Sequence, residues 1–495
     1  MKKVLIAIAL LVGLSSCEKF LNVNPINKAY EEDLLKDRSG FEAALGGAYE
    51  SLASDTLYGR DMKYGLMETL VGSYSTLGAG HKYYRLSRYE YNYDESKKFI
   101  KEIWSKFYKT INQVNVILKN IDHIQSDPSY NLVKGEAIGL RAFAHFQLLK
   151  LFGPSFANEG GTGLAIPYKT EVSFQGVKFS TASEVIKLLK KDLMEARALL
   201  ENDPIRTQGR GETQNQFDYE KYNSLIDYRV IRMNYYAIIA LQAMVAQWEG
   251  DLVAAGAYAE ELIAEVDKLK SIRLATNTDF TYLGNVRLPM ESVFALFTNK
   301  LATYVPKSFV ALESSTSAST SPYLFPNYTW LNTNLYNKSG SGSTNDNRLT
   351  NWFSRPNTSY PWKLSKYLFD FTKPYTDQSY KIFYENKVIS LHTIYMIAAE
   401  SYASKNPTKS FEYLNKVRNA RNITTNLSYT SSITEKETKD FIFDEMRKEN
   451  IAEGYLFTEY KRLFRAIDRS PIVQPKKEIF NLPIPDDELL FNPQN

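Results

Sequence analysis

The chain has 495 residues, one cysteine and a formal net charge of +4. A single cysteine excludes an internal disulfide framework and any zinc site built from several cysteines. Charged residues of mixed sign make up 23% of the chain, so electrostatics gives no reason to expect nucleic acid as a partner. The length suits two or three domains or one large helical array.

Residues 1–16 have the pattern of a signal peptide. Lys2 and Lys3 precede an uncharged apolar stretch over 4–14, which is far shorter than the ~20 residues needed to cross a bilayer. The following "LSSC" at 14–17 resembles a bacterial lipobox, whose cysteine is lipidated and becomes the first residue of the mature chain. We therefore predict lipidation of Cys17; the alternative is an ordinary secretory signal with an incidental cysteine.

Helical periodicity dominates the first half of the mature chain. Apolar residues recur every three or four positions over 101–122 and 133–152, and Gly153-Pro154 ends the second run. A third helix is predicted over 181–201, with Thr181 or Ser183 as its N-cap and Glu184 close behind.

Two pairs of helices follow the pattern of tetratricopeptide-type hairpins. The first pair is predicted over 227–248 and 252–268 and is rich in alanine, which lets antiparallel helices approach closely. The second pair is predicted over 389–404 and 408–422, and one further helix over 434–466. No strict 34-residue period is present, so any repeats are degenerate.

A different composition marks residues 270–387. Seven prolines and a Ser/Thr/Asn/Gly-rich stretch at 314–346 exclude long helices, whereas the many aromatic residues argue against plain disorder. A similar block lies at 55–98, where Tyr89, Tyr91 and Tyr93 alternate; an extended chain would place all three on one face, either packed on a helix or facing a ligand.

No motif for catalysis or metal binding is complete. The four histidines form no His-Glu-x-x-His pattern, and neither a Gly-x-Ser-x-Gly elbow nor a phosphate-binding loop occurs. A glycosidase needs only two carboxylates brought together by folding, which a sequence cannot exclude. Asp444, Glu445, Glu449 and Glu453 are candidates, but basic neighbours favour a solvated helix face with local ion pairs. We expect no catalytic residue, metal or cofactor.

Aromatic residues with polar neighbours indicate a carbohydrate-binding surface. Flat rings pack on sugar C–H surfaces, and amide or guanidinium groups bind the hydroxyls. Trp104 and Trp248 lie in helix stripes and are predicted to be core. The first candidates for ligand contact lie in the loop-rich block: Trp330, Trp352 and Trp362, with Tyr328, Asn347 and Arg348.

Several stretches together resemble the SusD/RagB family of outer-membrane lipoproteins. They are "CEKFLNVNP", "WSKFYKTINQVN", "GEAIGLRAFAHFQLLKLFG", "IYMIAAESYA", "LNKVRNARN", "FIFDEMRKENIAEGYLFTEYKRL" and "LPIPDDELLFNPQ", and they run in the family's order from Cys17 to the end. The resemblance departs at Met446 and Leu456, where the family usually has arginine.

The resemblance implies a mostly α-helical fold in one domain over 17–495. Tetratricopeptide-like helix pairs at about 30–270 and 388–470 would form a superhelical scaffold, and the loop-rich insertion at about 270–387 would face the ligand. Family ligand contacts also lie ahead of the first long helix, which adds Tyr74, His81, Tyr83 and Tyr84 as second candidates.

The function that the resemblance implies is non-enzymatic. Such proteins are lipid-anchored to the outer membrane, face the cell exterior, and pass an oligosaccharide to a SusC-type TonB-dependent transporter. Some members capture peptides instead, so a peptide ligand stays open, and a glycoside hydrolase is the third possibility.

Overall fold

The computed structural model describes residues 31, 33–173, 175–210, 225–281, 287–298, 300–309, 321–338, 345–355, 357–367 and 385–492. Cys17 and the predicted signal peptide lie outside these residues. The fold is mostly α-helical, as predicted. Within the described residues, no helix combines the length and the apolar character needed to cross a membrane.

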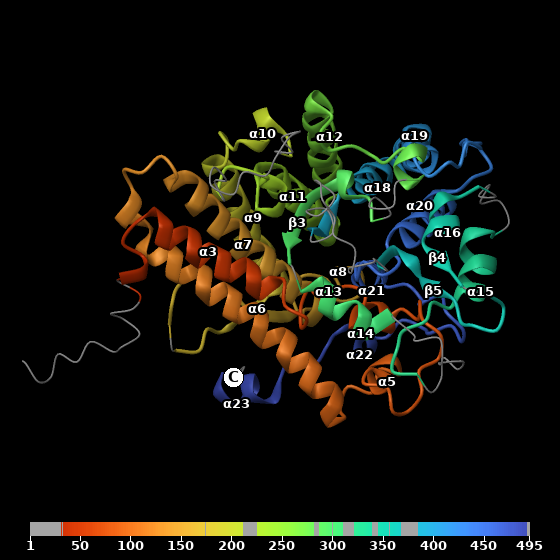
Figure 1. Cartoon of the computed structure of the whole chain (residues 1–495), viewed down its shortest axis with the longest axis horizontal. Helices are drawn as coiled ribbons and strands as arrows, with labels where there is room; N and C mark the ends of the chain where they lie inside the picture. Colours follow the sequence, from red (N-terminus) through yellow and green to blue (C-terminus); the bar gives the residue numbers. More distant parts are fainter. Residues whose placement is uncertain are drawn as a thin grey trace, which may run out of the picture.

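The long helices form a continuous array in which each packs on the next along the chain. Figure 1 shows the array running from α3 and α6 at one end to α19 and α20 at the other. Its members are α3 (Arg38–Leu52), α6 (Asp94–Asn120), α7 (Tyr130–Phe152), α9 (Ala182–Leu199), α11 (Tyr235–Glu249), α12 (Leu252–Leu269), α18 (Leu391–Tyr402), α19 (Pro407–Asn419) and α20 (Glu435–Glu449).

Shorter elements connect and flank this array. The short helices are α4 (Leu66–Leu70), α5 (Tyr84–Ser87), α8 (Phe156–Glu159), α10 (Ile205–Gln208), α13 (Leu301–Tyr304), α14 (Pro306–Phe309), α15 (Tyr328–Leu331), α16 (Asn347–Asn351), α21 (Leu456–Arg462), α22 (Lys477–Phe480) and α23 (Asp486–Phe491). Three antiparallel strand pairs are β1 (Leu164–Pro167) with β2 (Phe179–Thr181), β3 (Ser292–Phe297) with β6 (Glu385–Ser390), and β4 (Phe353–Ser354) with β5 (Lys363–Leu364).

Local sequence signals explain where the predicted helices begin and end. Helix α9 starts in a capping box, in which Thr181 N donates to Glu184 Oε2 at 2.7 Å and Glu184 N donates to Thr181 Oγ1 at 3.3 Å. Helix α7 ends at Phe152, directly before the predicted stop at Gly153-Pro154. The first two predicted helices, the helix over 181–201 and both predicted pairs are thus confirmed as elements.

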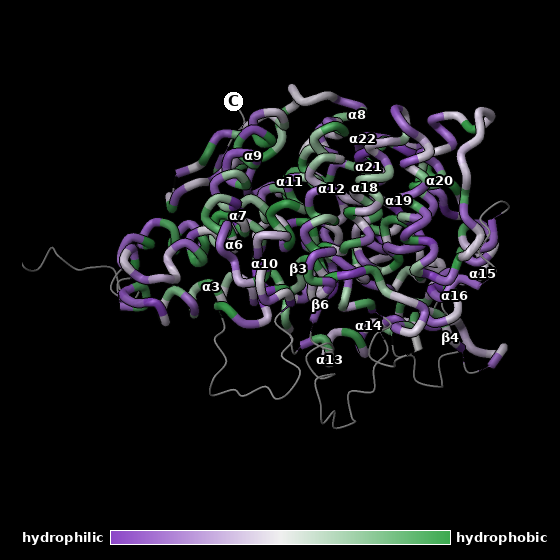
Figure 2. The backbone as a smooth tube through the Cα atoms, turned by 90° about the horizontal axis from the view of Figure 1, so that it is seen from above, coloured by the Kyte–Doolittle hydropathy of each residue, from purple (hydrophilic) through white to green (hydrophobic). Residues whose placement is uncertain are grey.

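Small residues allow close contacts within the array. The alanines of α11 are buried, and the α11–α12 turn uses Gly250 at φ 91°. A Cβ added to Gly256 of α12 would lie 2.4 Å from Ser401 Oγ of α18. Helix α7 is buried on all sides between Gly135 and Phe152, and Figure 2 shows apolar segments concentrated in the interior of the array.

Two predictions about local structure were wrong. The helix predicted over 434–466 is two helices, α20 and α21, because the chain turns through Ala452 (φ 62°) and Gly454 (φ 71°) between them. Tyr89, Tyr91 and Tyr93 do not share one face: Tyr89 and Tyr91 donate to Leu70 O and Ile479 O, whereas Tyr93 is 46% exposed.

The loop-rich block is anchored to the helical array at both ends. Strand β3 follows its start and pairs with β6 at its end, which leads directly into α18. No helix in the described part of 270–387 is longer than five residues, as the composition predicts. This arrangement places the predicted ligand-side segment beside the C-terminal half of the array (Figure 1).

Candidate ligand-binding surface

The two regions predicted to contact a ligand lie side by side. Ser75 N donates to Phe325 O and Asn327 N donates to Ser73 O, each at 2.8 Å, and Tyr74 forms an antiparallel bridge with Pro326. These backbone contacts join the segment ahead of α6 to the segment that leads into α15. Residues some 250 positions apart in the chain therefore form one surface.

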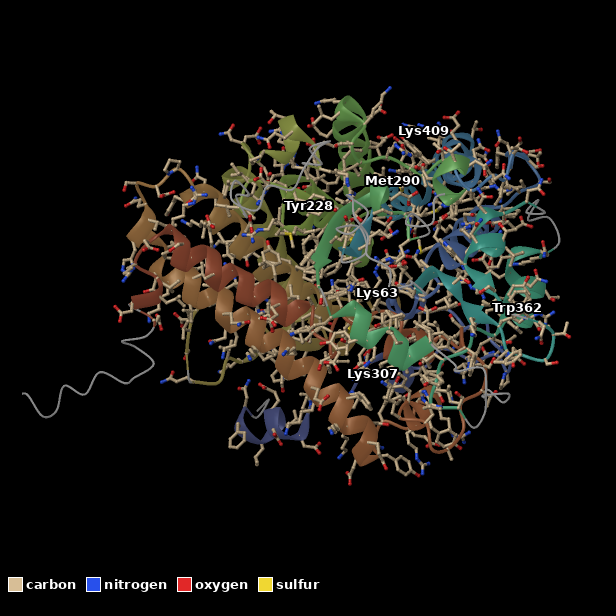
Figure 3. The ribbon with its side chains drawn as sticks, in the orientation of Figure 1. Lys63, Tyr228, Met290, Lys307, Trp362 and Lys409 are labelled. Carbon is tan, nitrogen blue, oxygen red and sulfur yellow. The ribbon has the colours of Figure 1, made fainter. Side chains whose placement is uncertain are left out.

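An aromatic stack forms the edge of this surface. The rings of Tyr328 (α15) and Trp362 lie 3.6 Å apart between centroids at 18°, and the ring of Phe353 meets Tyr328 edge-on. The exposed Arg355 places its guanidinium 4.7 Å from the centre of the Trp362 ring. Both stacked rings are half-buried, and Figure 3 shows Trp362 at the outer edge of the molecule.

Trp330 is half-buried on the other side of α15. The guanidinium of Arg447 lies 5.5 Å from its ring and is held by Asp468 at 2.8 Å and Asp444 at 3.3 Å. The hollow that Trp330 shares with Val71 has a volume of only about 10 Å³, so it is too small for a ligand. Trp330 therefore offers the exposed part of its ring rather than a pocket.

Tyr84 is the accessible residue of the second group. It begins α5 and is half-buried, with the guanidinium groups of Arg85 and Arg88 at 5.7 and 5.6 Å from its ring. Cation–π contacts of this kind place hydrogen-bond donors beside an aromatic face.

Three residues of the first group lie in the interior instead. Trp352 is 1% exposed, with Lys366 Nζ 4.0 Å from its ring centre, and Asn347 donates to Asn277 Oδ1 at 2.7 Å. Arg348 is fully buried among carboxylates. We no longer propose them as ligand contacts, because their side chains fill the fold.

Three residues of the second group are also buried. Tyr74 and Tyr83 donate their hydroxyls to Tyr64 O and to Asp61. The Nδ1 atom of His81 accepts from Tyr83 N at 3.1 Å, and burial lowers the pKa of His81 to about 4. The hydroxyls of Tyr74 and Tyr83 therefore hold this segment to the interior and do not face a ligand.

Three of the four candidate carboxylates of α20 and the turn after it are not on a solvated face, so for them that interpretation was wrong; Asp444 is half-buried. Glu445, Glu449 and Glu453 are buried, although the predicted ion pairs do form. Burial acts to raise the pKa of Glu449, but the charges of Arg421 and Arg348 hold it below its usual value. A glycosidase acid needs the opposite shift, because it must keep its proton at neutral pH.

One cluster in the described residues has the ligand types of a metal site. The side-chain ligand atoms of Glu291, His392 and Glu449 lie within 4.8 Å of one another. Arg421 already bridges the two carboxylates, at 2.7 Å to Glu291 Oε1 and 2.6 Å to Glu449 Oε1. The arginine supplies the positive charge that a metal ion would bring, so we assign no metal to this cluster.

The largest hollows described lie away from the aromatic surface. One of about 490 Å³ is lined by α18, α20 and the segment around α21, with Ile442, Phe443 and Met446 among charged residues. Another of about 360 Å³ lies between α3 and the end of β3. Neither contains a predicted ligand residue, so among the described residues the candidate site is an open surface.

Two arginines of this surface were missed by the sequence analysis. Arg355 and Arg447 lie over Trp362 and Trp330, but Arg355 precedes a proline in a loop and Arg447 sits within a helix of mixed charge. Nothing in their local sequence indicates an aromatic partner.

Comparisons with known proteins agree with this architecture. Residues 19–210 match a family model described as "Starch-binding associating with outer membrane", SusD-like. SusD-like protein P38 of Formosa agariphila is 23% identical over 484 residues, which covers 92% of this chain and 90% of that protein. The chain is thus similar to SusD-like proteins over most of its length. SusD-like protein P2 of the same organism is 28% identical, over 30% of this chain and 29% of that protein.

Solved structures of the SusD superfamily share the fold. A putative sugar binding protein from Bacteroides vulgatus has a TM-score of 0.68 and 21% identity, and the match covers 92% of this chain and 97% of that one. A SusD superfamily protein from Bacteroides thetaiotaomicron has a TM-score of 0.64 and 21% identity, covering 92% and 98%. At these identities the likeness concerns the fold alone.

Proposed function

We propose that this SusD-like chain captures an oligosaccharide at the outer membrane and delivers it to a SusC-type transporter. The observation that carries the glycan part is the half-buried aromatic group Tyr328, Trp330 and Trp362 on a chain whose family model is described as starch-binding. Sugar rings bind flat aromatic faces, with side-chain donors at their edges.

The exposed arginine at this surface, Arg355, suits the same ligand class. Each guanidinium carries five N–H donors and has no acceptor, so it can bind sugar hydroxyl oxygens. Arg355 is exposed, so a ligand can share or displace its contact with Trp362. Arg447 is 4% exposed and held by two aspartates, so it fixes the ring of Trp330 and does not itself face the ligand.

Lipidation of Cys17 would place this surface at the membrane. A diacylated cysteine with an added N-acyl chain buries many CH₂ groups at about 0.8 kcal/mol each, which suffices for stable anchoring. No enzymatic step is included, because the α20 carboxylates with lowered pKa values do not suit acid catalysis.

Isothermal titration with a panel of oligosaccharides tests glycan capture. We expect one glycan class to bind and the variants Trp362→Ala and Trp330→Ala each to weaken it about tenfold or more, since loss of an aromatic contact at a hot spot costs on the order of 1.4 kcal/mol or more. Tyr429→Ala is the matched control. Tyr429 is 39% exposed and lies in the connection between α19 and α20, so it is an accessible aromatic residue that is not part of the stack.

If no glycan of the panel binds, and if peptides bind and need the same tryptophans, then the ligand is a peptide and not a glycan. Delivery is tested separately: the lipidated chain should co-purify with a large β-barrel protein from solubilised outer membranes. Repeated purification of the chain alone would contradict the transporter part of the proposal.

A further inference from the structure

The described part of the loop-rich block around the aromatic edge carries an excess of positive charge. Segments 321–338, 345–355 and 357–367 contain one acidic residue, Asp346, and five basic ones. The basic residues are Lys338, Arg348, Arg355, Lys363 and Lys366. The charge of this edge therefore depends on which of the five cations pair with carboxylates from other parts of the fold.

Three of the five cations are paired. Lys338 pairs with Asp444, Arg348 with Asp346, Glu445 and Glu449, and Lys366 with Glu453. Arg355 and Lys363, in contrast, form no ion pair with a carboxylate of the described residues. Arg355 is exposed and Lys363 is half-buried, so both charges act at the surface.

The acidic residues that contact the same edge are already matched by cations. Asp444 and Asp468 lie 3.3 and 2.8 Å from Arg447, and Asp444 also pairs with Lys338. Two carboxylates thus face two cations and leave no negative charge for Arg355. A surface with unmatched positive charge favours a negatively charged ligand.

The β4–β5 hairpin places Arg355 on the aromatic stack. The two strands pair as far as Ser354 and Lys363, so Arg355 and Trp362 are the next residues on the two strands. Tyr328 covers one face of the Trp362 ring at 3.6 Å between centroids, and the Arg355 guanidinium lies over that ring at 4.7 Å from its centre. Side chains alternate along a strand, so Lys363 points to the other face of the hairpin and adds charge without touching the stack.

We propose that the oligosaccharide bound at the aromatic edge carries an anionic group, a carboxylate or a sulfate, and that Arg355 binds this group. The inference rests on the proposed glycan capture and adds the chemical class of the glycan. A guanidinium presents paired N–H donors that match two oxygens of a carboxylate or sulfate. The contact of Arg355 with Trp362 is a cation–π contact, so these donors remain available.

Isothermal titration with matched pairs of glycans tests for the anionic group. Oligosaccharides of uronic acids are compared with their carboxyl-reduced forms, and sulfated oligosaccharides with their desulfated forms. We expect one acidic glycan to bind about tenfold or more tightly than its neutral form, the usual gain from hydrogen bonds to a charged group. The pair that shows this preference also tells a carboxylate from a sulfate.

Arg355→Met should abolish the preference, so that the acidic and neutral forms bind equally. Arg355→Lys should keep part of it, because it retains the charge but loses the paired donors. Lys405→Met is the matched control for the loss of one positive charge, since Lys405 is exposed between α18 and α19, and it should bind like wild type. Added salt should weaken binding of the acidic glycan more in wild type than in Arg355→Met.

A neutral glycan that binds as tightly as its acidic counterpart would overturn this inference and leave glycan capture intact. An acidic preference that survives Arg355→Met would overturn the role of Arg355. Binding of no glycan at all would overturn the proposed function and this inference with it, so the two failures are distinguishable.

Discussion

Buried arginine–carboxylate contacts connect the loop-rich block to the helical array. Arg348 of α16 pairs with Asp346 at 2.6 Å and with Glu449 at 2.7 Å, and Arg421 pairs with Glu449 and Glu291. Because all of these groups are buried, each charge depends on its partner for the hydrogen bonds that water would provide. Arg348 thus fixes where the block sits on α20.

Arg348→Met should destabilise the protein by about 3–5 kcal/mol, the usual cost of removing one partner from a buried ion pair. The variant leaves Asp346, Glu445 and Glu449 with fewer cations. Urea unfolding measures the loss. Arg88→Met is the control, because Arg88 is exposed and its partners among the described residues are Glu90 and Tyr84. The free energy of unfolding of this variant should change by less than about 0.5 kcal/mol.

Buried lysines make stability depend on pH. Burial lowers the pKa of Lys461 to about 7 and that of Lys63 to about 8, from 10.5. Between these values and 10.5 the unfolded chain binds more protons than the folded chain, so stability rises with pH. We expect a higher free energy of unfolding at pH 9 than at pH 7, by on the order of 1–2 kcal/mol from Lys461.

Denaturant unfolding at pH 7, 8 and 9 measures how the free energy of unfolding changes with pH. Lys461→Met should reduce the rise of the free energy of unfolding with pH. The variant also removes the donor of the Gly153 carbonyl, which lies 2.6 Å from Lys461 Nζ in the wild type. Stability that stays level or falls over this range would mean that the buried lysines keep their protons.

At the scale of elements, the α20–α21 junction shows why one predicted helix became two. Gly454 lies at φ 71°, and a Cβ there would lie 2.0 Å from Met62 O and 2.7 Å from Lys63 Cα. The junction therefore packs directly on the backbone ahead of α4. In the sequence, the helical spacing of apolar residues continues through the junction, because the apolar residues on both sides of it face the same core.

Gly454→Ala should destabilise the fold by more than about 2 kcal/mol, since it combines a left-handed backbone with a steric clash. Gly46→Ala provides the contrast: it lies inside α3 with no atom within 4 Å of the added Cβ, so alanine should stabilise by about 0.5–1 kcal/mol. Thermal unfolding of both variants measures the difference. Equal effects would mean that the α20–α21 turn adapts freely.

At the scale of the whole molecule, the helical array serves as the rigid support of an aromatic edge. The edge carries Tyr328, Trp330 and Trp362, and it is fixed by the strands β4 and β5, by backbone bonds to residues 73–75 and by Arg348. A surface held in this way can present aromatic faces without reorganising on binding, which limits the entropy lost on association.

The proposed membrane anchor concerns the whole chain, and it would depend on Cys17. We expect Cys17→Ala to move the protein from the membrane fraction to the soluble fraction of cells, because the lipid would be absent. Metabolic labelling with a fatty acid should mark the wild type and not the variant. A Cys17→Ala protein that still sediments with membranes would disprove anchoring by that residue.

The helical elements were determined by the sequence itself. Apolar spacing, caps such as Thr181 with Glu184, and breakers such as Gly153-Pro154 act within a few residues, so local patterns predict them. Trp104 and Trp248, in helix stripes, are core as predicted, at 3% and 2% exposure. The motifs that resemble the SusD/RagB family likewise lie in the chain itself.

Only the tertiary structure decided which aromatic residues reach the surface and which charges are paired. Trp352 and Trp362 have similar polar neighbours in the sequence, yet one is 1% exposed in the core and the other is half-buried at the edge. Arg348 meets Glu449, 101 residues away. Such contacts depend on how distant segments pack, and no local pattern in the sequence encodes that packing.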